Sequence, residues 1–277
     1  MKEKVKSIFC GLGYMALLLG INLAVSLVFQ FIISFAMGFQ MAAAGITMVG
    51  EEFLEKYTDF VMQYQLHATI AYQIFALFII WLISKCRRHK LSTDANLTKF
   101  RPTSAPFIVI LGIALSFLIS IVMSAVVPEA MLEDYMEASA GIANAPMLVQ
   151  FISAVILAPI VEEIFFRGYV LPRFRKAMPL PLAIFFSSLA FGLIHGQIVW
   201  ITYATILGII MTLIALRENS VWASILMHVA FNSVSLFSEY LPESDIFYLV
   251  IFVISLVACI GCFWLLFKNK KANTVVA

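Results

Sequence analysis

The chain has 277 residues, of which 62% are hydrophobic and 12% are charged, and its formal net charge is +2. A soluble domain of this length could not bury so much apolar surface, so the composition excludes a soluble globular protein and indicates a membrane protein. The net charge is too small to indicate a nucleic-acid-binding protein, and no nucleic-acid partner is expected.

Eight apolar segments follow one another along the chain, and we expect each to be a membrane-spanning α-helix. They are long and lack the alternating pattern of barrel strands, which favours helices. Their approximate ranges are residues 8–36, 66–84, 106–127, 147–171, 180–196, 198–216, 220–237 and 246–267. The predicted fold is an all-α polytopic transmembrane helix bundle of about eight spans, with residues 1–277 as a single membrane domain.

The basic residues orient this bundle. Lys and Arg precede the first span and follow the second, fourth, sixth and last spans, which is one side of the membrane if the spans alternate. The positive-inside rule makes that side the cytoplasm. We therefore expect both termini and the 85–101 loop in the cytoplasm, and residues 38–65 and 128–146 outside, where Lys56 is the only Lys or Arg among acidic residues.

Apolar residues recur at helical spacing in both outer loops, over residues 53–64 and 131–136. We expect interfacial helices that pack on the outer surface, with control of substrate access as the alternative. Cys259 and Cys262 are spaced like a redox pair but lie within an apolar span without other ligand types, so packing is the favoured interpretation.

Two adjacent glutamates lie in the fourth span, within Ala158-Pro159-Ile160-Val161-Glu162-Glu163-Ile164-Phe165-Phe166-Arg167-Gly168. Ionisable groups at such depth are costly and usually functional. Glu163 and Arg167 are four residues apart and can pair on one helix face, whereas Glu162 is rotated by roughly 100° from Glu163. One arginine cannot neutralise two carboxylates, so the spacing predicts one structural and one free acid.

Two later spans carry further polar residues. His195 follows Phe191 by one helical turn, and His228 and Asn232 share a face because they are four residues apart. A free carboxylate, two imidazoles and an amide can supply a base for water, metal ligands or electrophilic donors, and a group that stabilises an oxyanion. Amide hydrolysis is the reaction that these groups suit. By helical rise, Glu162 and His228 lie at similar depths from the cytoplasmic side, about 16 and 14 Å. His195 lies farther, at about 20 Å, unless its helix starts deep or is tilted.

In sequence, the three motifs resemble the CPBP intramembrane proteases, which include CAAX prenyl endopeptidases and bacteriocin-processing or immunity (Abi-like) proteins. The family pattern is Glu-Glu-x-x-x-Arg, then Phe-x-x-x-His, then His-x-x-x-Asn or Asp, and this chain matches every motif position. The resemblance covers about residues 147–237, the expected catalytic core, and the first three spans match only in being hydrophobic.

This resemblance implies that Glu162 activates the hydrolytic water. It implies a site lined by Glu162, His195, His228 and Asn232, with Glu163, Arg167 and Phe191 in support. The resemblance leaves open whether the site binds Zn²⁺, because Glu162, His195 and His228 could ligate the metal and the same residues could act without it.

The expected function is that of an intramembrane endopeptidase acting on a membrane-associated protein or peptide precursor. A transporter is disfavoured because repeat symmetry and matching broken helices are not visible. A non-catalytic membrane scaffold or bacteriocin immunity factor is the stronger alternative, and the complete motif set favours the enzyme. The short loops suggest a bacterial plasma membrane, where a prenylated substrate is not expected. The oligomeric state does not follow from the sequence.

Overall fold

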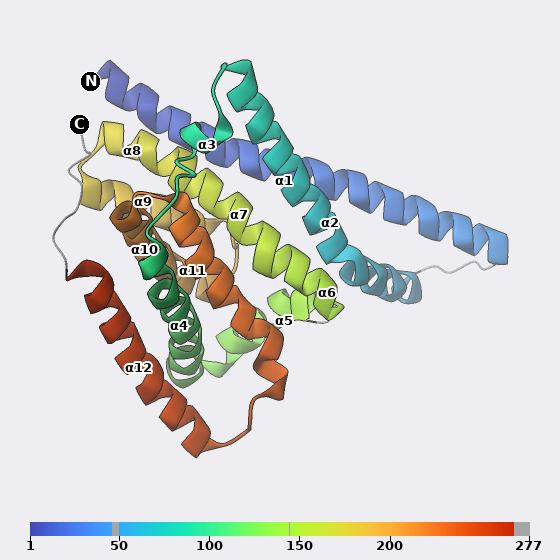
Figure 1. Cartoon of the computed structure of the whole chain (residues 1–277). Coiled ribbons are helices and arrows are strands. Elements are labelled where there is room, and N and C mark those ends of the chain that lie inside the picture. The colour runs from blue at the N-terminus through green and yellow to red at the C-terminus, as the bar shows by residue number, and fades with distance from the viewer. Residues whose placement is uncertain (46–49, 144, 269–277) are drawn as a thin grey trace.

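The computed structural model describes residues 1–45, 50–143 and 145–268, and every regular element within them is a helix (Figure 1). The predicted all-α class is confirmed. Short helices α3 (Leu91–Asp94) and η1 (Pro102–Ser104) lead into α4, and α5 (Glu129–Ala143) follows Pro128.

Eight helical segments correspond to the eight predicted spans. They are α1 (Lys2–Ala44), α2 (Glu51–Cys86), α4 (Ala105–Val126), the continuous helix over residues 147–177, α9 (Leu180–Leu193), α10 (Ile198–Glu218), α11 (Val221–Ser233) with the 3-10 segment η4 (Val234–Tyr240), and α12 (Asp245–Phe267). Six of them are long and apolar enough to cross a membrane, whereas α9 and the α11 segment are shorter. The described residues thus contain six candidate spans and two shorter apolar helices at the positions of the eight predicted spans.

The short α9 has a local cause. It begins after Pro179 and ends just before a turn in which Gly196 has a φ of 77°, a conformation that favours glycine. Its 14 residues span about 21 Å, less than the ~30 Å of a hydrocarbon core. It packs along α10, so protein can shield its ends in place of lipid.

The predicted interfacial helix over residues 53–64 is not a separate element. It continues without a break into the second span, so that α2 has 36 residues. No Gly or Pro occurs between Glu51 and Cys86, and nothing in the sequence therefore interrupts the helix.

The basic segments gather at one end of the bundle. Arg101 forms two hydrogen bonds with the buried Glu218 carboxylate, at 2.6 and 3.2 Å, and this contact raises the pKa of Arg101. Ser7 near the start of α1 donates to the carbonyl of Arg173 at 2.7 Å. The start of α1 thus lies beside the end of the 147–177 helix, and the segment before α4 lies beside the end of α10.

The central part of the bundle surrounds the 147–177 helix. α4 packs against both α11 and α12, and α1 packs along α2 and the end of the 147–177 helix. Figure 1 shows much of α1 extending beyond the other helices. Its exposed phenylalanines Phe31, Phe35 and Phe39 are suited to lipid rather than water.

Candidate active site

The two glutamates lie on a helix with an unusual backbone. The 147–177 helix consists of α6 (Met147–Gln150), the π-helical η2 (Phe151–Leu157), α7 (Ala158–Glu163), the π-helical η3 (Ile164–Val170) and α8 (Leu171–Ala177). Pro159 cannot donate a helical hydrogen bond, which favours wider turns beside it. Such π-turns are frequent at functional sites, and here they flank Glu162 and Glu163 on both sides.

Glu163 and Arg167 form the predicted pair in the core. Arg167 Nη1 donates to Glu163 Oε1 at 2.8 Å, and both side chains are at most 1% exposed. Arg167 also donates from Nη2 to the carbonyl of Gly208 at 2.8 Å and from Nε to Thr212 Oγ1 at 3.3 Å. Its guanidinium carbon lies 4.6 Å from the centre of the Phe191 ring. The Arg167 guanidinium is therefore held in place by groups on three helices, its own, α9 and α10.

His228 on α11 bridges the two acids. Its Nδ1 lies 3.1 Å from Glu163 Oε1, and its Nε2 lies 3.8 Å from Glu162 Oε2. A carboxylate only accepts hydrogen bonds, so Nδ1 carries a hydrogen and Nε2 of the neutral ring has a free lone pair. Sequence spacing gave no sign of the Glu163–His228 contact, because 65 residues separate the two positions.

Glu162 has a different environment from its neighbour. Its side chain is 19% exposed, whereas that of Glu163 is fully buried. Among the described residues, the contact with His228 is its one ion-pair contact, and no hydrogen bond occupies its oxygens. The rotation expected from the helix thus separates a constrained acid from an accessible one.

Phe191 lies between the two imidazoles. Its ring centre is 5.1 Å from that of His195 and 5.9 Å from that of His228, and both contacts are edge-on. The ring is 1% exposed and also packs on Phe166 at 5.4 Å. Phe191 therefore holds the spacing of the histidines in addition to filling the core.

His195 lies just beyond the end of α9 and is half-buried. Its Nδ1 is 3.0 Å from the carbonyl of Phe191 and 3.3 Å from that of Gly192, so Nδ1 donates and Nε2 is left as the free ring atom. Its ring packs 5.3 Å from that of Trp200. Sequence analysis missed Trp200, which reads as an ordinary apolar residue of its span.

The side chain of Asn232 contacts the backbone of the 147–177 helix, which carries both glutamates and is called the glutamate helix below. Its Nδ2 donates to the carbonyl of Ala154, in π-helical η2, at 2.8 Å. An amide nitrogen has two hydrogens, so one N–H is committed to this contact and a second can serve another acceptor. The structure thus brings Asn232 to the same helix as the glutamates, at a carbonyl eight residues before Glu162, a little over two helical turns.

The three tentative zinc ligands do not form a metal-binding group in this arrangement. Among the described residues, no three His, Cys, Asp or Glu side chains come together in a way that could hold a metal ion. Glu162 and His228 are close, and the edge of the Phe191 ring contacts both His228 and His195. Cys259 and Cys262 are likewise free thiols outside any such group.

Aromatic residues extend from His195 towards α5. The Tyr135 ring, on α5, packs edge-on against Trp200 at 5.9 Å and against Tyr203 at 6.2 Å. The second outer segment is therefore in contact with residues beside the site, and does not pack only on the outer surface.

Residues 144–234, about a third of the chain, match the family described as type II CAAX prenyl endopeptidase Rce1-like. No curated protein and no solved structure matches the chain. The matched range runs from the start of the glutamate helix to the end of α11 and includes every residue of the three motifs. The chain is a membrane protein whose residues 144–234 match a CAAX-protease-like family model of the CPBP type.

Proposed function

We propose that this protein is an intramembrane endopeptidase in which Glu162 activates water. The observation that supports this most strongly is the difference in environment between the adjacent side chains of Glu162 and Glu163. Glu163 is occupied by Arg167 and His228, while Glu162 is partly accessible and lies 3.8 Å from His228 Nε2. A general base must be able to reach water, and Glu162 meets that requirement better than Glu163.

In the proposed reaction, Glu162 takes a proton from water as the water oxygen bonds to the carbonyl carbon of the scissile peptide. The proton then passes to the amide nitrogen, and the C–N bond breaks to give a carboxylate and an amine. The remaining N–H of Asn232 stabilises the negative charge on the former carbonyl oxygen. One water is consumed for each bond cleaved, and no further reactant is needed.

The histidines position the water in this proposal. His228 offers Nε2 as an acceptor because Glu163 binds its other nitrogen, and the Phe191 and Gly192 carbonyls orient His195 in the same way. A hydrogen bond from water to His228 Nε2 would place that water beside Glu162. Glu163 thus acts on the water through His228.

The reaction as proposed contains no metal step. Chelation tests this directly: cleavage by the purified protein should be indifferent to prolonged treatment with a strong zinc chelator. Inhibition that added Zn²⁺ reverses would instead mean that Glu162, His195 and His228 close around a metal during turnover, which is the other mechanism that the motif permits.

The proposed substrate is a membrane-associated protein or a peptide precursor, and the proposed location is a bacterial plasma membrane. The compact chain and its short loops support this location. Comparison of membrane proteomes from cells with the wild-type protein and with Glu162→Gln tests both function and substrate. Wild-type cells should contain new protein termini that Glu162→Gln cells lack.

A matched control is Glu55→Gln, which makes the same chemical change at an exposed position on α2. It should give the wild-type set of termini. Identical termini and an unchanged biological phenotype in Glu162→Gln cells would favour the non-catalytic scaffold or immunity factor.

A further inference from the structure

A polar cavity lies at the basic end of the bundle, between the first turns of α1 and the helix α8. Its volume is about 340 Å³, within the range of small-molecule pockets. Its lining residues are Glu3, Lys6, Ser7, Cys10, Arg173 and Lys176. Arg173 lies ten residues beyond Glu163 on the same continuous helix, about 15 Å by helical rise, so this cavity is separate from the candidate active site.

Packing fixes the walls of the cavity. The Ser7 hydroxyl donates to the carbonyl of Arg173, and Gly11 lets α1 approach α8 so closely that an added Cβ would lie 2.7 Å from Phe174. The Arg173 guanidinium stacks on the rings of Tyr14 and Tyr169, at 4.8 and 5.1 Å. An arginine held in this way loses little conformational entropy when it binds an anion.

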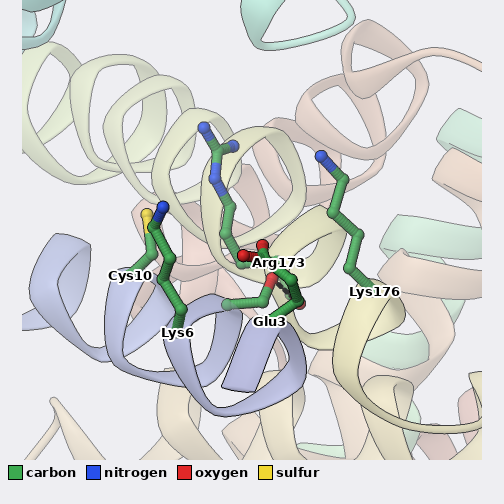
Figure 2. Close-up of a pocket in the computed structure, with 6 residues that line it drawn as sticks. Glu3, Lys6, Cys10, Arg173 and Lys176 are labelled. Atoms are coloured by element: carbon green, nitrogen blue, oxygen red, sulfur yellow. Dashed lines mark hydrogen bonds between the residues drawn. The ribbon is translucent and has the colours of Figure 1, made fainter. Parts of the chain in front are cut away.

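The charges in the cavity do not balance. Figure 2 shows the side chains of Lys6, Arg173 and Lys176 extending in the same general direction, with Glu3 as the one acid among them. None of the ion pairs found in the described residues involves Lys6 or Lys176, and both are exposed. Three cations that repel one another beside one carboxylate favour an anionic ligand.

The cavity lies at the level where lipid head groups are expected. Arg87, just past the end of α2, donates to Tyr14 Oη at 2.6 Å, so α2 ends level with the cavity. One turn earlier, the Lys85 ammonium lies 4.9 Å from the Trp81 ring, an arrangement typical of a membrane interface. Phe9, exposed on α1 next to the lining residues, is suited to the acyl chains.

We propose that this cavity binds the phosphate group of an anionic phospholipid from the leaflet at the basic end. Guanidinium and ammonium groups are the donors that proteins use for phosphate, and basic pockets between membrane helices bind anionic head groups. The Glu3 carboxylate beside the cations suits a head group that also carries hydroxyls, such as phosphatidylglycerol. This site does not depend on the proposed protease function.

The test uses the purified full-length chain in a neutral detergent and follows its thermal stability as phosphatidylglycerol, phosphatidylcholine or inorganic phosphate is added. The variant Lys6→Gln/Lys176→Gln removes two charges from the cavity. The control Lys2→Gln/Lys4→Gln removes two charges from the same helix but from residues that do not line it. Equal melting temperatures without lipid check that both variants fold.

Phosphatidylglycerol should stabilise the wild type and the control more than phosphatidylcholine does. The cavity variant should bind it roughly 25-fold more weakly, because each of the two lysines near an anionic lipid contributes a factor of about five. An equal loss in the control would mean diffuse surface charge and would overturn the site. Equal stabilisation by inorganic phosphate, with nothing added by the lipid, would overturn the lipid assignment in favour of a soluble phosphate.

Discussion

Glu163 is bonded to both Arg167 and His228, whereas Glu162 has neither contact at hydrogen-bond distance. In a low-dielectric interior, an ionised carboxylate is tolerated only when it is paired and hydrogen-bonded. Arg167 therefore neutralises one acid and leaves the other to react. The two residues are adjacent in sequence, so a single helix delivers both the structural and the reactive carboxylate.

Arg167→Ala should lower stability as well as activity, because it leaves the Glu163 charge buried without its partner. Removal of one member of a buried pair typically costs about 3–5 kcal/mol. Thermal unfolding in detergent measures this, with Arg88→Ala as an exposed control that also removes one guanidinium. A melting temperature equal to that of the wild type would contradict the structural role of the pair.

Asn232→Ala should reduce cleavage without abolishing it. Loss of one oxyanion donor costs roughly 10²–10³-fold in rate, and loss of the bond to the Ala154 carbonyl costs about 1 kcal/mol of stability. Rate measurements on a defined substrate separate the two effects, because the stability loss alone leaves kcat of the folded fraction unchanged. A wild-type kcat in Asn232→Ala would remove Asn232 from the proposed reaction.

The sequence predicted much of the candidate site and less of its connections. Helical spacing was enough to pair Glu163 with Arg167 and to separate Glu162 from both. It could not predict that Glu163 binds His228, because that contact depends on how α11 packs against the glutamate helix. It also missed Gly208 and Thr212, whose contacts with Arg167 come from a third helix.

At the level of elements, a glycine sets the distance between α4 and α11. A Cβ on Gly112 would lie 2.5 Å from the carbonyl oxygen of Met227, the residue before His228. Gly112→Ala should therefore push α11 outward, lower stability by about 1–3 kcal/mol and reduce cleavage. Melting temperature and activity, measured on one preparation, report both effects.

The matched control is Gly13→Ala, because nothing lies within 4 Å of a Cβ added at Gly13. This variant should lose no stability, since alanine is the better helix former. Similar losses in Gly112→Ala and Gly13→Ala would show that close approach of α4 and α11 is not what Gly112 provides.

Hydrophobic runs predicted that helices exist more reliably than they predicted where helices end. All eight predicted segments are helical, yet α9 is too short to span a bilayer and α2 absorbs an element expected to be separate. Apolar residues suit lipid and the protein interior equally, so composition does not distinguish a full span from a short helix enclosed by others. For α9, the turn at Gly196 ends the helix before it is long enough to span a bilayer.

At the level of the whole molecule, the basic end defines an orientation that labelling can test. In a background without the native cysteines, Thr93→Cys and Ala138→Cys place exposed thiols at opposite ends. A membrane-impermeant reagent added to intact cells should label Ala138→Cys and not Thr93→Cys, because the positive-inside rule puts the basic end in the cytoplasm. Labelling of Thr93→Cys alone would invert the orientation.

The central claim is that Glu162 supplies chemistry and Glu163 supplies structure. The most direct measurement is cleavage and thermal unfolding of Glu162→Gln on one purified preparation, beside the wild type. Gln keeps the shape of the side chain but cannot take the proton, so cleavage should fall roughly 10²–10⁴-fold. The melting temperature should stay close to that of the wild type, because Glu162 makes no hydrogen bond that holds the core. Full cleavage activity in a folded Glu162→Gln protein would contradict the account.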